Sequence, residues 1–260
     1  MNKRDIVRST VAERARTLAL LNPLPVERFD TSTALEGWRI REVVAHLITT
    51  DRGSVTGSIA VVVFRSTDRL ERWNDRQVKA WADRPVRELL LALDRWGRRF
   101  ATYARAIPVP AYRLRLRTMY GRGPAGLLIW ARPFDEWVHR QDIRRALDLP
   151  DEEVDLETVA EFVLTAISVN TLPQLEAASG RVALSLTDVA LPEWSYDLAA
   201  RTGGPGSAEG ADARIMASAG PFVMASAHRE SFAELEARGA VKLEGDEDLA
   251  RTFLSKVRIV

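Results

Sequence analysis

The chain contains three histidines, and one of them follows an aspartate at a spacing that suits metal binding. Asp135 and His139 are four positions apart in a segment with a helical pattern. On a helix, their side chains lie one turn apart on the same face, which is how a helix offers two ligands to one metal ion. On spacing alone, however, a carboxylate and a histidine so placed are more often a surface pair.

Three neighbouring positions bear on the same chemistry. Asp142 lies three residues beyond His139, where its carboxylate could hold the second nitrogen of a ligating imidazole. The alternative for Asp142 is a salt bridge with an arginine such as Arg145. Glu136 points away from the Asp135 face by about 100° and is the less suitable ligand. His46 flanks the apolar stripe of another predicted helix, where a partly buried, hydrogen-bonded histidine is the ordinary explanation.

Composition limits the remaining chemistry. The chain has no cysteine, which excludes disulfides, cysteine nucleophiles and thiolate metal sites, so any thiol must come from a cofactor. Its 37 basic and 36 acidic side chains nearly cancel, and no net field favours nucleic acid or a membrane surface. The N-terminal segment is charged rather than apolar, and the run Ile59–Phe64 is too short to span a bilayer. We therefore expect a cytoplasmic protein without nucleic-acid or membrane partners.

Hydrophobic periodicity predicts four helices in the first part of the chain, with loops whose length suits a helical bundle. Pro133 lies inside the fourth helix, where it should kink the helix or mark a fresh start at Phe134. The predicted helices cover 5–22, 39–52 and 85–106, and a segment that runs from the loop at 121–124 to about 147.

The pattern changes after Pro150, and a small α+β domain is predicted there. A helix over about 156–177 is followed by segments whose hydrophobic residues alternate with a period of two. The overall fold class is therefore α+β, with a bundle domain at 1–150 and an α+β domain at 151–260. Within the second domain we predict strands at 182–186, 194–198, 214–217 and 241–243, a glycine-rich loop at 203–210 and a last helix at 246–256.

Two segments resemble the mycothiol-dependent maleylpyruvate isomerase family, whose N-terminal half is a DinB-like four-helix bundle. The first runs from Glu36 to Leu47 and contains a Gly-Trp pair and a histidine followed by leucine; the second runs from Asp135 to Arg144 and contains a carboxylate, His and Arg-x-Asp. The resemblance implies a metal site formed by His46, Asp135 and His139. The family usually has glutamate where this chain has Asp135, so Glu136 remains an alternative ligand.

The resemblance extends to a sterol-carrier-like C-terminal domain through Leu243–Asp246 and the following Leu249-Ala250. Phe222–Arg229 is similar to a family helix that ends in an arginine facing the active site. The resemblance thus implies that Arg229 binds a substrate carboxylate, for which a guanidinium is well suited. A solvated surface arginine is the alternative. His228 is expected to be structural or exposed.

Three protein ligands are typical of a catalytic zinc site, although nickel, manganese and iron accept the same donors. The resemblance implies mycothiol as the thiol: its thiolate adds to an activated double bond, the bond rotates, and elimination gives the trans alkene. We therefore expect a metal- and mycothiol-dependent cis-trans isomerase or thiol S-transferase acting on an unsaturated keto acid or other electrophile, as a monomer or small homo-oligomer. Trp38 would line its cleft or pack in the core. The alternative is a non-catalytic metal- or small-ligand-binding protein of the same fold.

Overall fold

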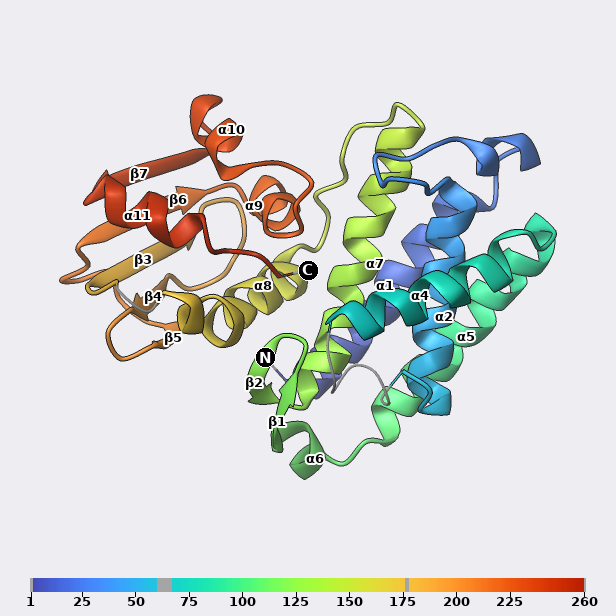
Figure 1. Cartoon of the computed structure of the whole chain (residues 1–260), viewed down its shortest axis with the longest axis horizontal. Coiled ribbons are helices and arrows are strands. Elements are labelled where there is room, and N and C mark those ends of the chain that lie inside the picture. Colours follow the sequence, from blue (N-terminus) through green and yellow to red (C-terminus); the bar gives the residue numbers. More distant parts are fainter. Residues whose placement is uncertain (1, 60–66, 176–177, 260) are drawn as a thin grey trace. The chain divides into compact units, whose positions relative to one another are not determined.

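The computed structural model describes residues 2–59, 67–175 and 178–259 (Figure 1). The chain divides into two compact units, one formed by 1–119 with 124–152 and the other by 120–123 with 153–260. Apart from Ile59, the apolar run that ends at Phe64 lies outside the described residues. Among the described helices, none combines the length and apolar character that a membrane span requires.

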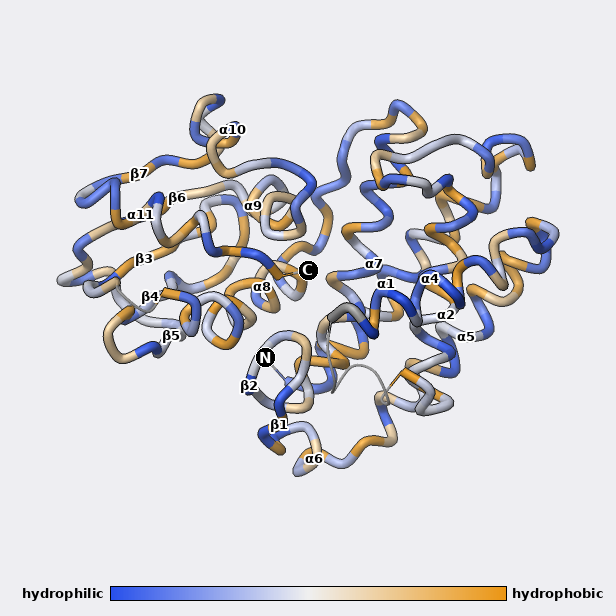
Figure 2. The backbone as a smooth tube through the Cα atoms, in the orientation of Figure 1, coloured by the Kyte–Doolittle hydropathy of each residue, from blue (hydrophilic) through white to orange (hydrophobic). Residues whose placement is uncertain are grey.

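The first unit is a helical bundle in which α2 packs against α4, α5 and α7, and α1 packs against α5 and α7 (Figure 1). Figure 2 shows hydrophobic and hydrophilic residues mixed along these helices, as expected for helices with one buried face. Between α6 and α7 the chain forms two short strands, β1 and β2, and most of β2 is assigned to the second unit. The elements in chain order are α1 (Lys3–Leu21), a 3-10 turn (Val26–Asp30), α2 (Ile40–Thr56), α4 (Thr67–Ala82), α5 (Val86–Ala106), α6 (Val109–Arg113), β1 (Arg115–Thr118), β2 (Gly121–Pro124) and α7 (Gly126–Ala146).

Local sequence explains the limits of α1 and α2. The side chain of Asn2 accepts hydrogen bonds from the backbone amides of Arg4 and Asp5 and so caps the start of α1. Helix α2 ends at Gly57, whose φ of 75° is the left-handed conformation that favours glycine. The predicted helix over 39–52 is therefore present but continues to Thr56.

Two features of the bundle concern points that the sequence left open. Helix α7 runs without interruption from Gly126 to Ala146, so Pro133 does not mark a fresh start at Phe134. Helix α4 occupies part of a segment whose structure the sequence left undefined. It packs closely on α2 because Gly53 has no side chain: a Cβ there would lie 2.7 Å from the ring of Trp73.

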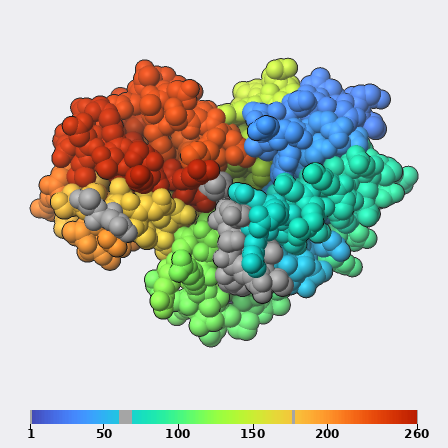
Figure 3. Space-filling view, in the orientation of Figure 1, coloured from blue at the N-terminus to red at the C-terminus, as the bar shows by residue number. Residues whose placement is uncertain are grey.

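The second unit contains a five-stranded sheet in the order β5-β4-β3-β6-β7. Strands β3 and β6 are parallel, and the other neighbours are antiparallel. Helix α11 packs on β3, β6 and β7 and lies outermost on the face shown in Figure 3, whereas α8 contacts β5 and α9. The elements are α8 (Glu157–Asn170), a 3-10 turn (Leu172–Gln174), β3 (Arg181–Leu186), β4 (Trp194–Asp197), β5 (Thr202–Pro205), β6 (Ala213–Ala217), α9 (Ala219–Ser226), α10 (Phe232–Ala237), β7 (Val241–Gly245) and α11 (Glu247–Leu254).

Two predictions for this unit were wrong in part. Helix α8 ends at Asn170 rather than near Ala177, which lies outside the described residues, because Pro173 cannot donate the backbone hydrogen bond that a continuing helix needs. The predicted glycine-rich loop begins with strand β5. Gly203 belongs to this strand because it faces Tyr196, whose ring would lie 2.4 Å from any Cβ at that position. The fold class itself, a helical region followed by an α+β region, is confirmed.

Candidate metal centre

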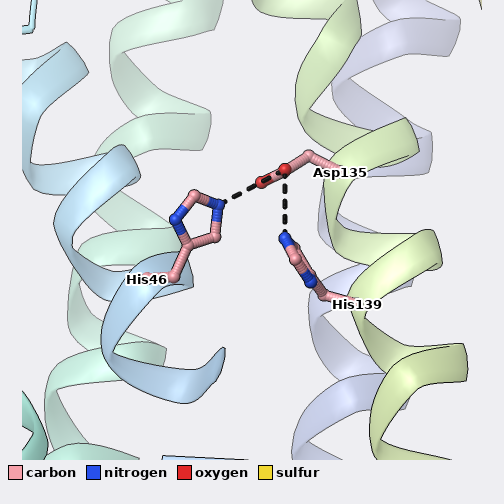
Figure 4. Close-up of side chains that lie close together, drawn as sticks. All are labelled: His46, Asp135 and His139. Carbon is pink, nitrogen blue, oxygen red and sulfur yellow. Dashed lines mark hydrogen bonds and ion pairs between the residues drawn. The ribbon is translucent and has the colours of Figure 1, made fainter. Parts of the chain in front are cut away.

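Helices α2 and α7 bring three potential metal ligands together (Figure 4). The Nε2 atom of His46 lies 3.4 Å from Oδ1 of Asp135, and Nε2 of His139 lies 3.6 Å from the same oxygen. The two imidazole centroids are 4.7 Å apart. One nitrogen or oxygen from each of the three side chains lies within 4.8 Å of the other two, so a single ion can contact all three.

The indole of Trp38 forms an aromatic wall beside the two imidazoles. Its centroid lies 5.4 Å from that of His46 and 6.1 Å from that of His139. The side chain is only partly buried and also packs against the bundle core. Trp38 therefore packs against the core, as one of the two alternatives required, and also lies beside the two imidazoles.

The other nitrogen of each imidazole has a hydrogen-bond acceptor. Nδ1 of His46 lies 2.7 Å from Oδ1 of Asn74 on α4, and Nδ1 of His139 lies 2.9 Å from Oδ2 of Asp142. Because both partners are acceptors, each Nδ1 carries a proton, and in the neutral imidazole the lone pair is then on Nε2. Both Nε2 atoms face Asp135. This is the arrangement that fixes ring orientation and tautomer in histidine metal sites.

The carboxylate of Asp135 is ionised and held from two sides. Burial raises the pKa of a carboxyl group, but the attraction of Arg132, and of His46 in its protonated form, outweighs this effect and keeps the pKa of Asp135 far below its usual range. Nη1 of Arg132 donates a hydrogen bond to Oδ2. The Oδ1 atom, which faces the two imidazoles, is thus the oxygen available to an ion.

A buried ionic cluster lies behind Asp135. Arg14 donates two hydrogen bonds to Glu136, of 2.9 and 2.7 Å, and one of 2.8 Å to Asp51; it also donates to the carbonyl of Leu93. Burial lowers the pKa of an arginine, but attraction to Glu136 and Asp51 outweighs it and raises the pKa of Arg14 above its ordinary value. Because Glu136 is engaged with Arg14, its carboxylate faces a different part of the bundle from the two histidines.

The donor set fits a divalent ion such as zinc. Ligands at ~2.0–2.1 Å from a tetrahedral zinc ion are separated from one another by about 3.3–3.4 Å. The two nitrogen–oxygen distances to Asp135 are close to this value without any rearrangement. Two imidazoles and one carboxylate are also a set that zinc accepts readily.

Two further candidate residues belong to the second unit. Arg229 lies three residues after the end of α9, is partly buried, and donates a 2.7 Å hydrogen bond to the carbonyl of Ala227. The predicted helix therefore ends before this arginine instead of at it. His228 is exposed, with a φ of 58°, as expected for a histidine outside the metal group.

Sequence reasoning named Asp142 as a support for His139 but missed the other residues that support the ligands. Asn74 is 28 positions from His46, and Arg14 is 122 positions from Glu136. Charged and amide side chains in helices are usually solvated, so nothing local indicated that these would be buried against the site. Arg132 offered the one usable signal, since it lies one helical turn before Asp135.

Comparisons with known proteins agree with this architecture. Residues 10–144, just over half of the chain, match the family described as mycothiol maleylpyruvate isomerase N-terminal domain. Two crystal structures of the mycothiol-dependent maleylpyruvate isomerase, one of them a histidine-to-alanine mutant, align over 94% of this chain and 93% of theirs. Their TM-scores are 0.58 and 0.60 for the wild type and the mutant, with identities of 16% and 15%, which shows a shared fold. A search of curated proteins found no match. The family match confirms the resemblance seen in the sequence, and the chain belongs to the mycothiol maleylpyruvate isomerase N-terminal domain family.

Proposed function

We propose that this protein is a metal- and mycothiol-dependent enzyme, a cis-trans isomerase of the maleylpyruvate isomerase type or a thiol S-transferase. One observation carries the proposal: His46, Asp135 and His139 each place a donor atom within 4.8 Å of the other two, and both imidazoles make a second hydrogen bond through Nδ1. Support of this kind is typical of histidines that bind a metal ion. Membership of the isomerase family supports the choice of thiol and reaction.

His46, Asp135 and His139 would hold the metal, for which zinc is the best candidate. A bound zinc ion supplies a Lewis acid that stabilises a thiolate at neutral pH. Among the described residues, the candidate ligand group contains three side chains. Three protein ligands from His, Asp or Glu are typical of catalytic zinc sites, whereas structural sites usually have four. This favours an enzyme over a protein that merely stores a metal.

The remaining residues have supporting tasks in this proposal. Asn74 and Asp142 hold the two imidazoles in the tautomer that leaves Nε2 free to ligate. Trp38 offers a flat apolar surface for the unsaturated part of a substrate beside the ligands. Arg229 would bind a substrate carboxylate through its guanidinium. The reacting thiol would be that of mycothiol, as in the family, and the absence of cysteine from the chain is compatible with this.

The test is an assay of the zinc-loaded protein with mycothiol and maleylpyruvate, followed by analysis of both product and thiol. An isomerase gives the trans product without consuming thiol, and an S-transferase consumes one thiol for each adduct formed. Omission of mycothiol or the change His46→Ala should abolish either reaction. If the zinc-loaded protein neither isomerises maleylpyruvate nor consumes thiol with a panel of electrophiles, it is the non-catalytic binding protein.

A further inference from the structure

Arg132 is a buried arginine that contacts a candidate metal ligand without being one. Its side chain is 5% exposed and lies one turn before Asp135 on α7. Nη1 donates to Oδ2 of Asp135, and Nε donates to Oδ1 of Asp51 over 2.9 Å. Nη2 lies 3.6 Å from Oε2 of Glu136. The planar guanidinium therefore contacts three carboxylates at once.

These contacts divide the two oxygens of Asp135 between different partners. Oδ2 is bonded to Arg132, whereas Oδ1 faces the Nε2 atoms of His46 and His139. An ion bound by the imidazoles would meet one carboxylate oxygen rather than two. Free rotation of the carboxylate would break its hydrogen bond with Arg132, so the arginine fixes which oxygen is presented.

The formal charges of the buried ionic group around Asp135 favour the binding of a cation. Arg14 and Arg132 carry two positive charges, and Asp51, Asp135 and Glu136 carry three negative ones. One negative charge is left over for a cation. Arg132 could not stay buried beside a cation site without compensation, and Asp51 and Glu136 supply it. Arg14 bonds to both of these carboxylates and so holds them in position.

We propose that Arg132 is a positioning residue of the metal centre, which holds Asp135 as a one-oxygen ligand. The inference rests on the metal site of the proposed function, but not on any particular reaction. It assigns a role in ion binding to a side chain that touches neither the ion nor a substrate. It also assigns a role to the buried cluster of Arg14, Asp51 and Glu136, which holds the side chain of Arg132 in place.

The test compares Arg132→Lys with Arg14→Lys in the full-length protein. Both changes keep the charge of the cluster and replace a planar fork by a single ammonium group. Of these two arginines, Arg132 bonds to Asp135, whereas the described bonds of Arg14 go to Asp51, Glu136 and the carbonyl of Leu93, so Arg14→Lys controls for general loosening of the cluster. Zinc affinity is measured by competition with a chromogenic chelator, and the visible absorption of bound cobalt(II) reports ligand geometry. Thermal unfolding of the metal-free variants shows whether each is folded.

We expect Arg132→Lys to lower zinc affinity by about 10-fold or more, the usual effect of losing a residue that orients a ligand, and to alter the cobalt spectrum. Arg14→Lys keeps a positive charge beside Asp51 and Glu136 and leaves the bond between Arg132 and Asp135, so it should lower thermal stability but change affinity and spectrum much less than Arg132→Lys does. Equal losses in the two variants, or wild-type affinity in Arg132→Lys, would overturn the inference. A wild-type protein that binds no zinc would overturn it together with the metal centre. Tight zinc binding without catalysis would overturn the proposed function alone.

Discussion

His139 and Asp142 face each other across one turn of α7, with Nδ1 of the imidazole 2.9 Å from Oδ2 of the carboxylate. Asp142 is 2% exposed, so its charge acts on the imidazole with little screening by water. A carboxylate in this position raises the electron-donating power of the opposite ring nitrogen. It also prevents the ring from turning, which keeps Nε2 directed at Asp135.

The first prediction concerns this carboxylate. Asp142→Ala should lower zinc affinity by about 10- to 100-fold, because the ring of His139 loses its orientation and part of its basicity. Asp142→Asn keeps an acceptor for Nδ1 and should lose less. Zinc titration against a competing chelator measures both. Asp151→Ala is the control, since Asp151 is an exposed partner of Arg145. If Asp142→Ala binds zinc as tightly as the control, the carboxylate does not support the site.

The second prediction separates the two neighbouring carboxylates that the sequence left as alternative ligands. Asp135→Asn should lose most bound zinc, because Asp135 faces both histidines. Glu136→Gln should keep a full equivalent of zinc but lower the free energy of unfolding by about 3 kcal/mol, because Arg14 is left buried without a full counter-charge. Elemental analysis and urea unfolding measure the two effects. Zinc loss in Glu136→Gln with retention in Asp135→Asn would reverse the assignment.

The sequence predicted the metal group better than its surroundings, for a physical reason. Asp135 and His139 are related by helical periodicity, and the family resemblance added His46. The residues that hold them, such as Asn74 and Arg132, belong to contacts whose geometry depends on how helices pack. No local pattern distinguishes a buried arginine from the many solvated ones in a chain with 37 basic side chains.

The fold shows the same division. The four bundle helices follow from their hydrophobic periodicity and from capping residues, which are local. Strand β5 was missed because glycine is unfavourable in an isolated strand, and only the approach of Tyr196 makes Gly203 suitable there. Helix α4 was not defined because its buried face appears only when it packs on α2. Local sequence patterns thus predicted most helices and strands. Strand β5 and helix α4 depend on tertiary contacts, which a local pattern does not reveal.

The third prediction tests the packing of the buried cluster. Gly97 on α5 lies against Arg14: an added Cβ would be 2.6 Å from Nη1, 3.1 Å from Cγ and 3.2 Å from Cζ. Arg14 cannot move aside without losing its bonds to Asp51 and Glu136. Gly97→Ala should therefore lower the free energy of unfolding by about 1–3 kcal/mol, although alanine normally stabilises a helix.

Urea unfolding measures this change, and Gly204→Ala is its control. No atom beyond the chain neighbours of Gly204 lies within 4 Å of a Cβ at that position, so little loss is expected there. A Gly97→Ala protein at least as stable as wild type would show that Arg14 has room to move and that the cluster is loosely packed.

The most direct test of the metal centre is the zinc content of the purified, zinc-supplied protein after excess metal is removed. Wild type is compared with His139→Ala and with His228→Asn, which removes an exposed histidine and tolerates the left-handed backbone at that position. The account predicts about one equivalent of zinc in wild type and in His228→Asn, and almost none in His139→Ala. No zinc in the wild type, or equal zinc in all three proteins, would contradict a site formed by His46, Asp135 and His139.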